Sequence, residues 1–187
     1  MHSLPRKHLV VFVLGLFLTA SVPAATNYIT GAITSNTTWS GTNQLSGTVT
    51  VQSGVVVTIA AGATVLMSNA ATLVVNGQLL ANGSSNAPIL FTRAGAGQTW
   101  SRLRFVRAND STLRYCTFEF ANSAGEHQDY YPTNCTTGLG QNPRNYHEAI
   151  VALATHLNVD HCLFRNLPDT SATAEGDALA IISDDPQ

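Results

Sequence analysis

Short runs of about five residues, rich in Val, Ile, Leu, Thr and Phe, recur in sets of three along this chain. Gly, Asn or Ser bound each run, and no helical periodicity competes with this strand pattern. The four sets are residues 47–51, 55–59 and 63–67; 72–76, 78–82 and 88–92; 102–106, 111–115 and 116–120; and 149–153, 156–160 and 162–166. A fifth set opens at 178–182. Three short strands per repeat predict a solenoid in which successive repeats stack.

The repeat alignment predicts which side chains stack. It places Cys116 over Cys162 as buried thiols, and it aligns the phenylalanines two residues further on. It also directs Glu119 and Arg165 outward, where we expect an exposed ion pair that contributes about 0.2 to 1 kcal/mol. The third cysteine, Cys135, is either free or paired with one of the other two.

The first repeats carry no charge, because Asp, Glu, Lys, Arg and His are all absent from Ala25 to Thr92. Strand alternation sends Val and Ile inward and leaves Thr, Gln and Ser facing water. Gly54 and Gly62 stand at predicted corners, where a positive φ is useful. The missing charge therefore indicates architecture and moves the search for function toward the later repeats.

Residues 1–24 have the pattern of a secretory signal peptide. A basic start with Arg6 and Lys7 precedes an apolar run of 12 residues, Leu9 to Ala20, and small residues follow up to Ala24. This run is shorter than the roughly 20 residues that cross a bilayer, so we expect export followed by cleavage rather than an uncleaved membrane tether. The predicted location is secreted or cell-surface, without membrane attachment after cleavage.

The charge balance argues against nucleic acid as a partner. Without Arg6 and Lys7, seven of the nine basic residues remain against eleven acids, which gives a formal charge of about −4. A nucleic-acid binder needs a basic footprint that neutralises phosphates. Three cysteines are also too few for a disulfide scaffold, and no Cys or His spacing typical of zinc occurs.

The motifs VTIAAGATVLM, LVVNGQLLANGSSNAPILFT, LRFVRANDSTLRYCTFEFA and LNVDHCLFRN…GDALAI resemble right-handed parallel β-helix repeat proteins of the pectin-lyase-like superfamily. The chain looks similar to the N-terminal portion of a secreted bacterial surface protein of this kind. The resemblance covers residues 45–182 and implies an all-β, right-handed, single-stranded parallel β-helix. It implies three strands per coil, with about four coils and the start of a fifth. The expected domains are a signal peptide at 1–24, an N-terminal cap at 25–44 that includes Trp39, and the β-helix at 45–187.

The resemblance does not fix an activity, since this superfamily contains lyases, hydrolases, adhesins and stalks. Asp160, His161 and Cys162 follow the order found in pectate-lyase-like members, but the accompanying Trp, catalytic Arg and acidic calcium cluster are missing. We therefore interpret Asp160 and His161 as repeat positions. We expect no cofactor, and calcium has no support in the residues.

The insertion at 122–147 departs most from the repeat and is longer than ordinary connections. It holds His127, Asp129, Tyr130 and Tyr131, and tyrosines beside acids suit sugar recognition. Alternatively, the insertion covers one flank of the solenoid. A metal site from its His and acidic residues has no known spacing to support it, so no metal is predicted.

Strand alternation predicts a second candidate site on the outer face of residues 102–106. Leu103 and Phe105 are expected inside, while Arg102, Arg104 and the nearby Arg93 are expected outside. Such a basic stripe would bind carboxylates of an acidic polysaccharide. The alternative is a solvated face neutralised by the later acids.

The predicted function is a secreted or cell-surface scaffold that binds carbohydrate, with a polysaccharide or surface glycan as partner. One alternative is a polysaccharide lyase or glycoside hydrolase whose catalytic coils lie beyond Gln187. Another is an adhesin-like stalk. Whether this chain is an enzyme stays open, although its residues favour a role without catalysis. Its oligomeric state is not predicted.

The last ten residues, ALAIISDDPQ, supply one strand of a fifth set without its second and third strands. A solenoid needs a capping element at this point, because an open end exposes its interior and strand edges. We therefore expect the chain to be a fragment of a longer polypeptide. Sequencing the locus tests this, and a genuine stop codon after Gln187 would contradict it.

Overall fold

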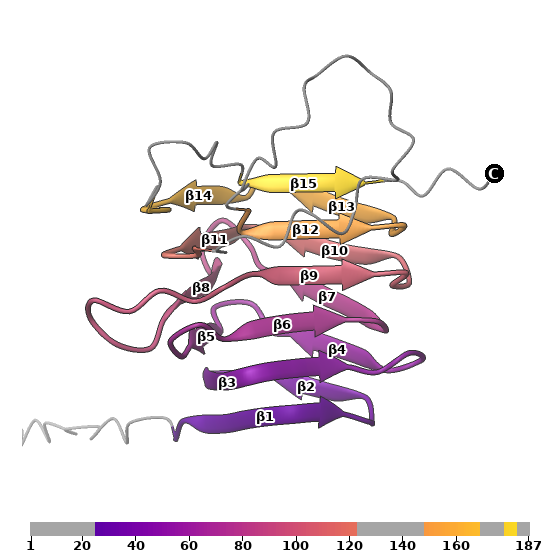
Figure 1. Cartoon of the computed structure of the whole chain (residues 1–187), viewed down its shortest axis with the longest axis horizontal. Helices are drawn as coiled ribbons and strands as arrows, with labels where there is room; N and C mark the ends of the chain where they lie inside the picture. The colour runs from indigo at the N-terminus through magenta and orange to yellow at the C-terminus, as the bar shows by residue number, and fades with distance from the viewer. Residues whose placement is uncertain (1–24, 123–147, 169–177, 183–187) are drawn as a thin grey trace, which may run out of the picture.

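The computed structural model describes residues 25–122, 148–168 and 178–182, which form an all-β, solenoid-like stack of parallel strands (Figure 1). Within these residues there is no helix. The strands are β1 (Asn27–Ile33), β2 (Thr37–Trp39), β3 (Thr42–Val51), β4 (Val56–Ile59), β5 (Thr64–Met67), β6 (Thr72–Val75), β7 (Gln78–Asn82), β8 (Ile89–Arg93), β9 (Leu103–Val106), β10 (Ser111–Arg114), β11 (Cys116–Glu119), β12 (Ile150–Leu153), β13 (Leu157–Asp160), β14 (Leu163–Arg165) and β15 (Leu179–Ile182).

Each strand from β4 onward pairs with the third strand after it along the chain. The pairs run β4–β7–β10–β13, β5–β8–β11–β14 and β6–β9–β12–β15, and all are parallel. Three strands therefore separate one level of the stack from the next, as Figure 1 shows for β6, β9, β12 and β15. The predicted strands and their stacking order are confirmed.

The long strand β3 belongs to two rows of the stack at once. Residues 42–45 pair with β5, whereas residues 48–51 pair with β6. Gly47 lies at the change of direction with φ +64°, a conformation that suits glycine because it has no Cβ. This continuous strand joins two rows into one ten-stranded sheet, while β2, β4, β7, β10 and β13 form a separate five-stranded sheet. The expected positive φ at Gly54 and Gly62 is also found, at +79° and +76°.

The interior is a continuous column of apolar side chains. Val, Ile, Leu and Ala from all three rows fill it, and Phe91, Phe105 and Phe118 are at most 1% exposed. Phe91, Phe118 and Phe164 stack in consecutive levels, with ring centroids 4.8 and 5.1 Å apart and an interplanar angle of 16° at each step. Register places these rings over one another, since Phe118 pairs with Phe91 below and Phe164 above. The predicted phenylalanine stack is confirmed.

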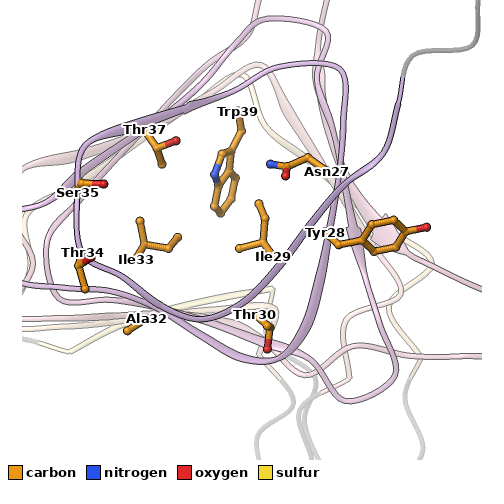
Figure 2. Close-up of a pocket in the computed structure, with 10 residues that line it drawn as sticks. All are labelled: Asn27, Tyr28, Ile29, Thr30, Ala32, Ile33, Thr34, Ser35, Thr37 and Trp39. Carbon is orange, nitrogen blue, oxygen red and sulfur yellow. The ribbon is translucent and has the colours of Figure 1, made fainter.

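Residues 27–39 extend the stack at its N-terminal end. Strands β1 and β2 pair in parallel with β3 and β4, in the same manner as the levels above. A hollow of about 380 Å³ opens at this end (Figure 2). Ile29, Ile33 and the buried Trp39 point into it, whereas Tyr28 points away and is 75% exposed. Trp39 is part of the buried core. The division of the chain into a cap at 25–44 and a β-helix at 45–187 stays a prediction.

Two predicted exposures are wrong. Glu119 is only 8% exposed and Arg102 only 3%, although both were expected to face solvent. The Glu119 side chain contacts Thr92 and Arg165 in the neighbouring levels, and its backbone carbonyl accepts a hydrogen bond from the Trp100 indole. Arg102 directly precedes β9, whose first residue, Leu103, donates a backbone hydrogen bond to the Ala149 carbonyl in the next level. Alternation along a strand gives a side chain's direction, but not whether neighbouring segments cover it.

We expect Phe118→Ala to lower the free energy of unfolding by about 3 to 5 kcal/mol, because it leaves a cavity between two stacked rings. The matched control is Thr117→Ala on the outward side of the same strand, with an expected change within about 0.5 kcal/mol. Urea unfolding followed by circular dichroism measures both. Equal losses in the two variants would contradict the stacked interior.

Candidate functional site

Four polar and aromatic residues gather at one corner of the stack, where β10 and β13 end. Strand pairing sets Arg114 opposite Asp160. Tyr115 and His161 follow directly, with φ values of +48° and +51°, as the chain turns into the next strand at each level. The two levels therefore make the same corner, and its side chains stack in pairs. We call Arg114, Tyr115, Asp160 and His161 the corner cluster.

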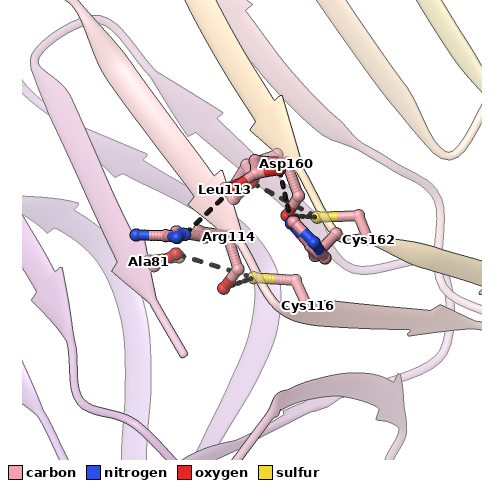
Figure 3. A network of polar contacts seen from close by, with 7 residues as sticks. Ala81, Leu113, Arg114, Cys116, Asp160 and Cys162 are labelled. Carbon is pink, nitrogen blue, oxygen red and sulfur yellow. Dashed lines mark hydrogen bonds and ion pairs between the residues drawn. The ribbon is translucent and has the colours of Figure 1, made fainter. Parts of the chain in front are cut away.

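The corner cluster is held by one ion pair, one hydrogen bond and one ring stack. Arg114 Nε lies 2.9 Å from Asp160 Oδ2 (Figure 3). Asp160 Oδ1 lies 2.5 Å from His161 Nδ1. The Tyr115 and His161 rings stack with centroids 4.6 Å apart and an angle of 24°. The Arg114 guanidinium carbon lies 5.4 Å from the Tyr115 ring centroid. Each of the four side chains thus contacts at least one other.

The corner cluster is accessible to solvent. The side chains of Arg114, Asp160 and His161 are 52%, 38% and 59% exposed. Exposed ion pairs stabilise a fold by only about 0 to 1 kcal/mol, so this arrangement contributes little to folding. It does present an aromatic stack beside a guanidinium and a carboxylate. Sugars are bound by such combinations, because ring faces pack on apolar sugar faces while charged groups bond hydroxyls or uronate carboxylates.

A second cluster ties three levels together beside β11. The buried Glu119 carboxylate accepts a hydrogen bond from Thr92 Oγ1 at 3.0 Å, and Arg165 Nε lies 2.5 Å from its other oxygen. The Arg93 guanidinium lies 3.8 Å from the centroid of the Phe120 ring, in cation–π geometry. The predicted pairing of Glu119 with Arg165 is confirmed, but its carboxylate is buried. This cluster connects β8, β11 and β14 and acts in stability.

The basic stripe does not form as expected. Arg102, which directly precedes β9, is buried, and Arg104 on β9 is half-buried. The Nε atoms of both are shielded from solvent. Arg93 contacts Phe120 on a different row of strands. These three arginines therefore do not share one open face. The insertion residues His127, Asp129, Tyr130 and Tyr131 lie outside the described residues.

Sequence reasoning passed over Tyr115 and treated Asp160 and His161 only as repeat positions. The signal was present in the alignment that stacks Cys116 on Cys162, because the two preceding residues are then Arg-Tyr in one repeat and Asp-His in the next. Opposite charges and two aromatic rings thereby fall into register. The pairing of whole corners, rather than single motifs, marks this site.

Among residues 25–122, 148–168 and 178–182, no group of three or more His, Cys, Asp or Glu is arranged to hold a metal ion. The same described part of the chain has no helix long and apolar enough to span a membrane. Comparisons of the chain with protein-family models, curated proteins and solved structures gave no match.

The Glu119 and Asp160 carboxylates make unequal contributions to stability, and substitution of each by alanine measures the difference. We expect Glu119→Ala to cost about 1.5 to 3 kcal/mol, because a buried charged acceptor of two hydrogen bonds is lost. Asp160→Ala is expected to cost less than about 1 kcal/mol, since its ion pair is exposed. Urea denaturation of both variants checks this, and a larger loss for Asp160→Ala would show that the corner cluster is structural.

Proposed function

We propose that this chain is part of a secreted or cell-surface, right-handed parallel β-helix with three strands per turn, and that it serves as a scaffold that binds carbohydrate. The parallel pairing of every third strand supports the β-helix. The right hand follows from the strong preference of successive parallel strands for right-handed crossovers. The leader-like residues 1–24 support export.

The observation that carries carbohydrate binding is the stack of the half-buried Tyr115 on the exposed His161, flanked by the Arg114–Asp160 ion pair. These groups are positioned by a rigid corner repeated in two levels, so their geometry is fixed before any ligand arrives. The Asp160 hydrogen bond to Nδ1 orients the His161 ring and leaves Nε2 for a ligand. Arg114 is suited to the carboxylate of an acidic sugar.

The neutral outer surface of the first repeats supports a scaffold role for that part of the chain. Residues 25–92 contain no charged side chain, and outward positions there are mostly Thr, Gln, Asn and Ser. Apart from the exposed Tyr28, such a surface has no side chain of the types that carry general acid–base catalysis. We therefore assign a structural role, as a rigid spacer, to these levels, and we assign ligand contact to the corner cluster.

Affinity gel electrophoresis against embedded pectin, alginate and xylan tests the proposal. We expect at least one polysaccharide to retard the wild-type chain. The Tyr115→Ala/His161→Ala double variant is expected to bind about tenfold more weakly, which corresponds to about 1.4 kcal/mol for the lost ring contacts. The matched control is Tyr28→Ala, an exposed tyrosine at the opposite end of the stack, which should leave binding unchanged.

Three outcomes contradict parts of this proposal. Absence of retention on every polysaccharide argues for an adhesin-like stalk. Unchanged retention of the Tyr115→Ala/His161→Ala variant removes the corner cluster as the contact. Release of unsaturated sugar ends, followed by ultraviolet absorbance, identifies a polysaccharide lyase instead. Far-ultraviolet circular dichroism of each variant shows whether its strands are intact.

A further inference from the structure

Two thiols from different levels of the stack meet beside the corner cluster. Cys116 begins β11, and Cys162 directly precedes β14. The next residues, Thr117 and Leu163, are register partners, so the two cysteines occupy equivalent positions on neighbouring parallel strands. Neighbouring strands lie about 4.8 Å apart. That separation falls within the Cα range of about 4.4 to 6.8 Å that disulfides span.

The two side chains are already in contact. Cys116 and Cys162 are close enough for each thiol to act on the pKa of the other. Each also lies against backbone carbonyls. Cys116 Sγ is 3.5 Å from the Arg114 carbonyl oxygen, and Cys162 Sγ is 3.3 Å from that of Leu113 (Figure 3). Both cysteines are reduced in this structure. Forming a bond between them requires rotation of side chains and no rearrangement of the strands.

The two thiols differ in access and in acidity. Cys116 is 1% exposed, whereas Cys162 is half-buried. The hydrogen bond from Cys116 lowers the pKa of Cys162 to about 7, against the opposing effects of burial and of the Asp160 charge. The same hydrogen bond, together with burial, raises the pKa of Cys116. Cys162 is therefore the thiolate that an external reagent meets first, and Cys116 is the resolving thiol behind it.

We propose that Cys116 and Cys162 form a redox-active pair that closes to a disulfide between β11 and β14 on exchange with a low-molecular-weight disulfide. The Cys162 thiolate attacks one sulfur of that disulfide, which gives a mixed disulfide and releases one thiolate. Cys116 then loses its proton to solvent and attacks the Cys162 sulfur, which releases the second thiolate. Two electrons pass from the protein to the reagent, and the two released thiolates take up two protons.

The disulfide would fasten the level before the insertion to the level after it. Residues 116 and 162 are bridged by a segment that includes the whole insertion, so the bond closes a long loop. Closing a long loop restricts the unfolded chain and raises resistance to denaturation. Export into an oxidising compartment would favour the closed form. The pair then acts as a lock on the later repeats, independent of carbohydrate binding.

The test uses the full chain with Cys135→Ser, so that only this pair of cysteines remains. The protein is incubated with glutathione disulfide, quenched with N-ethylmaleimide and digested with trypsin without reduction. We expect the peptides 115–144 and 145–165 to be joined by one disulfide, and both maleimide adducts to be lost. The urea midpoint should rise on oxidation and return after reduction. The oxidation rate should also rise with pH through about 7, as the Cys162 thiolate forms.

Single-cysteine variants identify the order of attack. With Cys116→Ser added, Cys162 should stop at a glutathione adduct; with Cys162→Ser added, the buried Cys116 should stay unmodified in the native state. A stable adduct on Cys162 that never closes in the Cys135→Ser chain would overturn the proposal. Absence of reaction at both thiols would overturn it equally. In the wild-type chain, digestion with trypsin and chymotrypsin places the three cysteines on separate peptides. A disulfide from Cys135 to Cys116 or Cys162 would contradict the proposed pair.

Discussion

In-register parallel hydrogen bonding between strands three apart along the chain is the constraint on which the rest of this structure depends. It satisfies the backbone donors and acceptors of each strand with its neighbours above and below, and it places equivalent repeat positions over one another. The phenylalanine stack, the paired cysteines and the Arg114–Asp160 ion pair are all consequences of that register. A shift by one residue would turn the entire inward set outward.

The corners repeat as faithfully as the strands. Arg107 and Ala154, Tyr115 and His161, and Phe120 and Asn166 occupy equivalent places in consecutive levels, and all six have positive φ between 46° and 60°. A left-handed conformation costs a non-glycine residue about 1 kcal/mol or more. The hydrogen-bonded strands on either side impose it at each level. Strained corners are thus a regular product of the stack, and one of them holds Tyr115 and His161 of the corner cluster.

The two proposals rest on different parts of the same corner. Carbohydrate binding is proposed for the Tyr115–His161 stack and the ion pair, whereas the buried Cys116 and the half-buried Cys162 are the residues that directly follow these two rings in the chain. Asp160 belongs to both environments, since it pairs with Arg114 and its charge acts on the Cys162 thiolate. A disulfide between the two thiols would cross-link β11 and β14, the strands that follow Tyr115 and His161.

The sequence by itself determined most strand segments from residue 47 onward and which segments stack, because inward Val, Leu and Phe repeat along the chain. It gave the observed register where Phe118 lies over Phe164. Elsewhere it was off by one residue, since Val56 rather than Val55 pairs with Gln78. It also determined that Glu119 meets Arg165, since register alone brings them together. Only the tertiary structure decided which outward side chains are covered. Glu119 is covered by contacts with Thr92 and Arg165 in the neighbouring levels, and Arg102 is buried as well, although strand alternation directs both outward. The corner cluster likewise required two levels to be stacked, because Tyr115 and His161 make a site only as a pair.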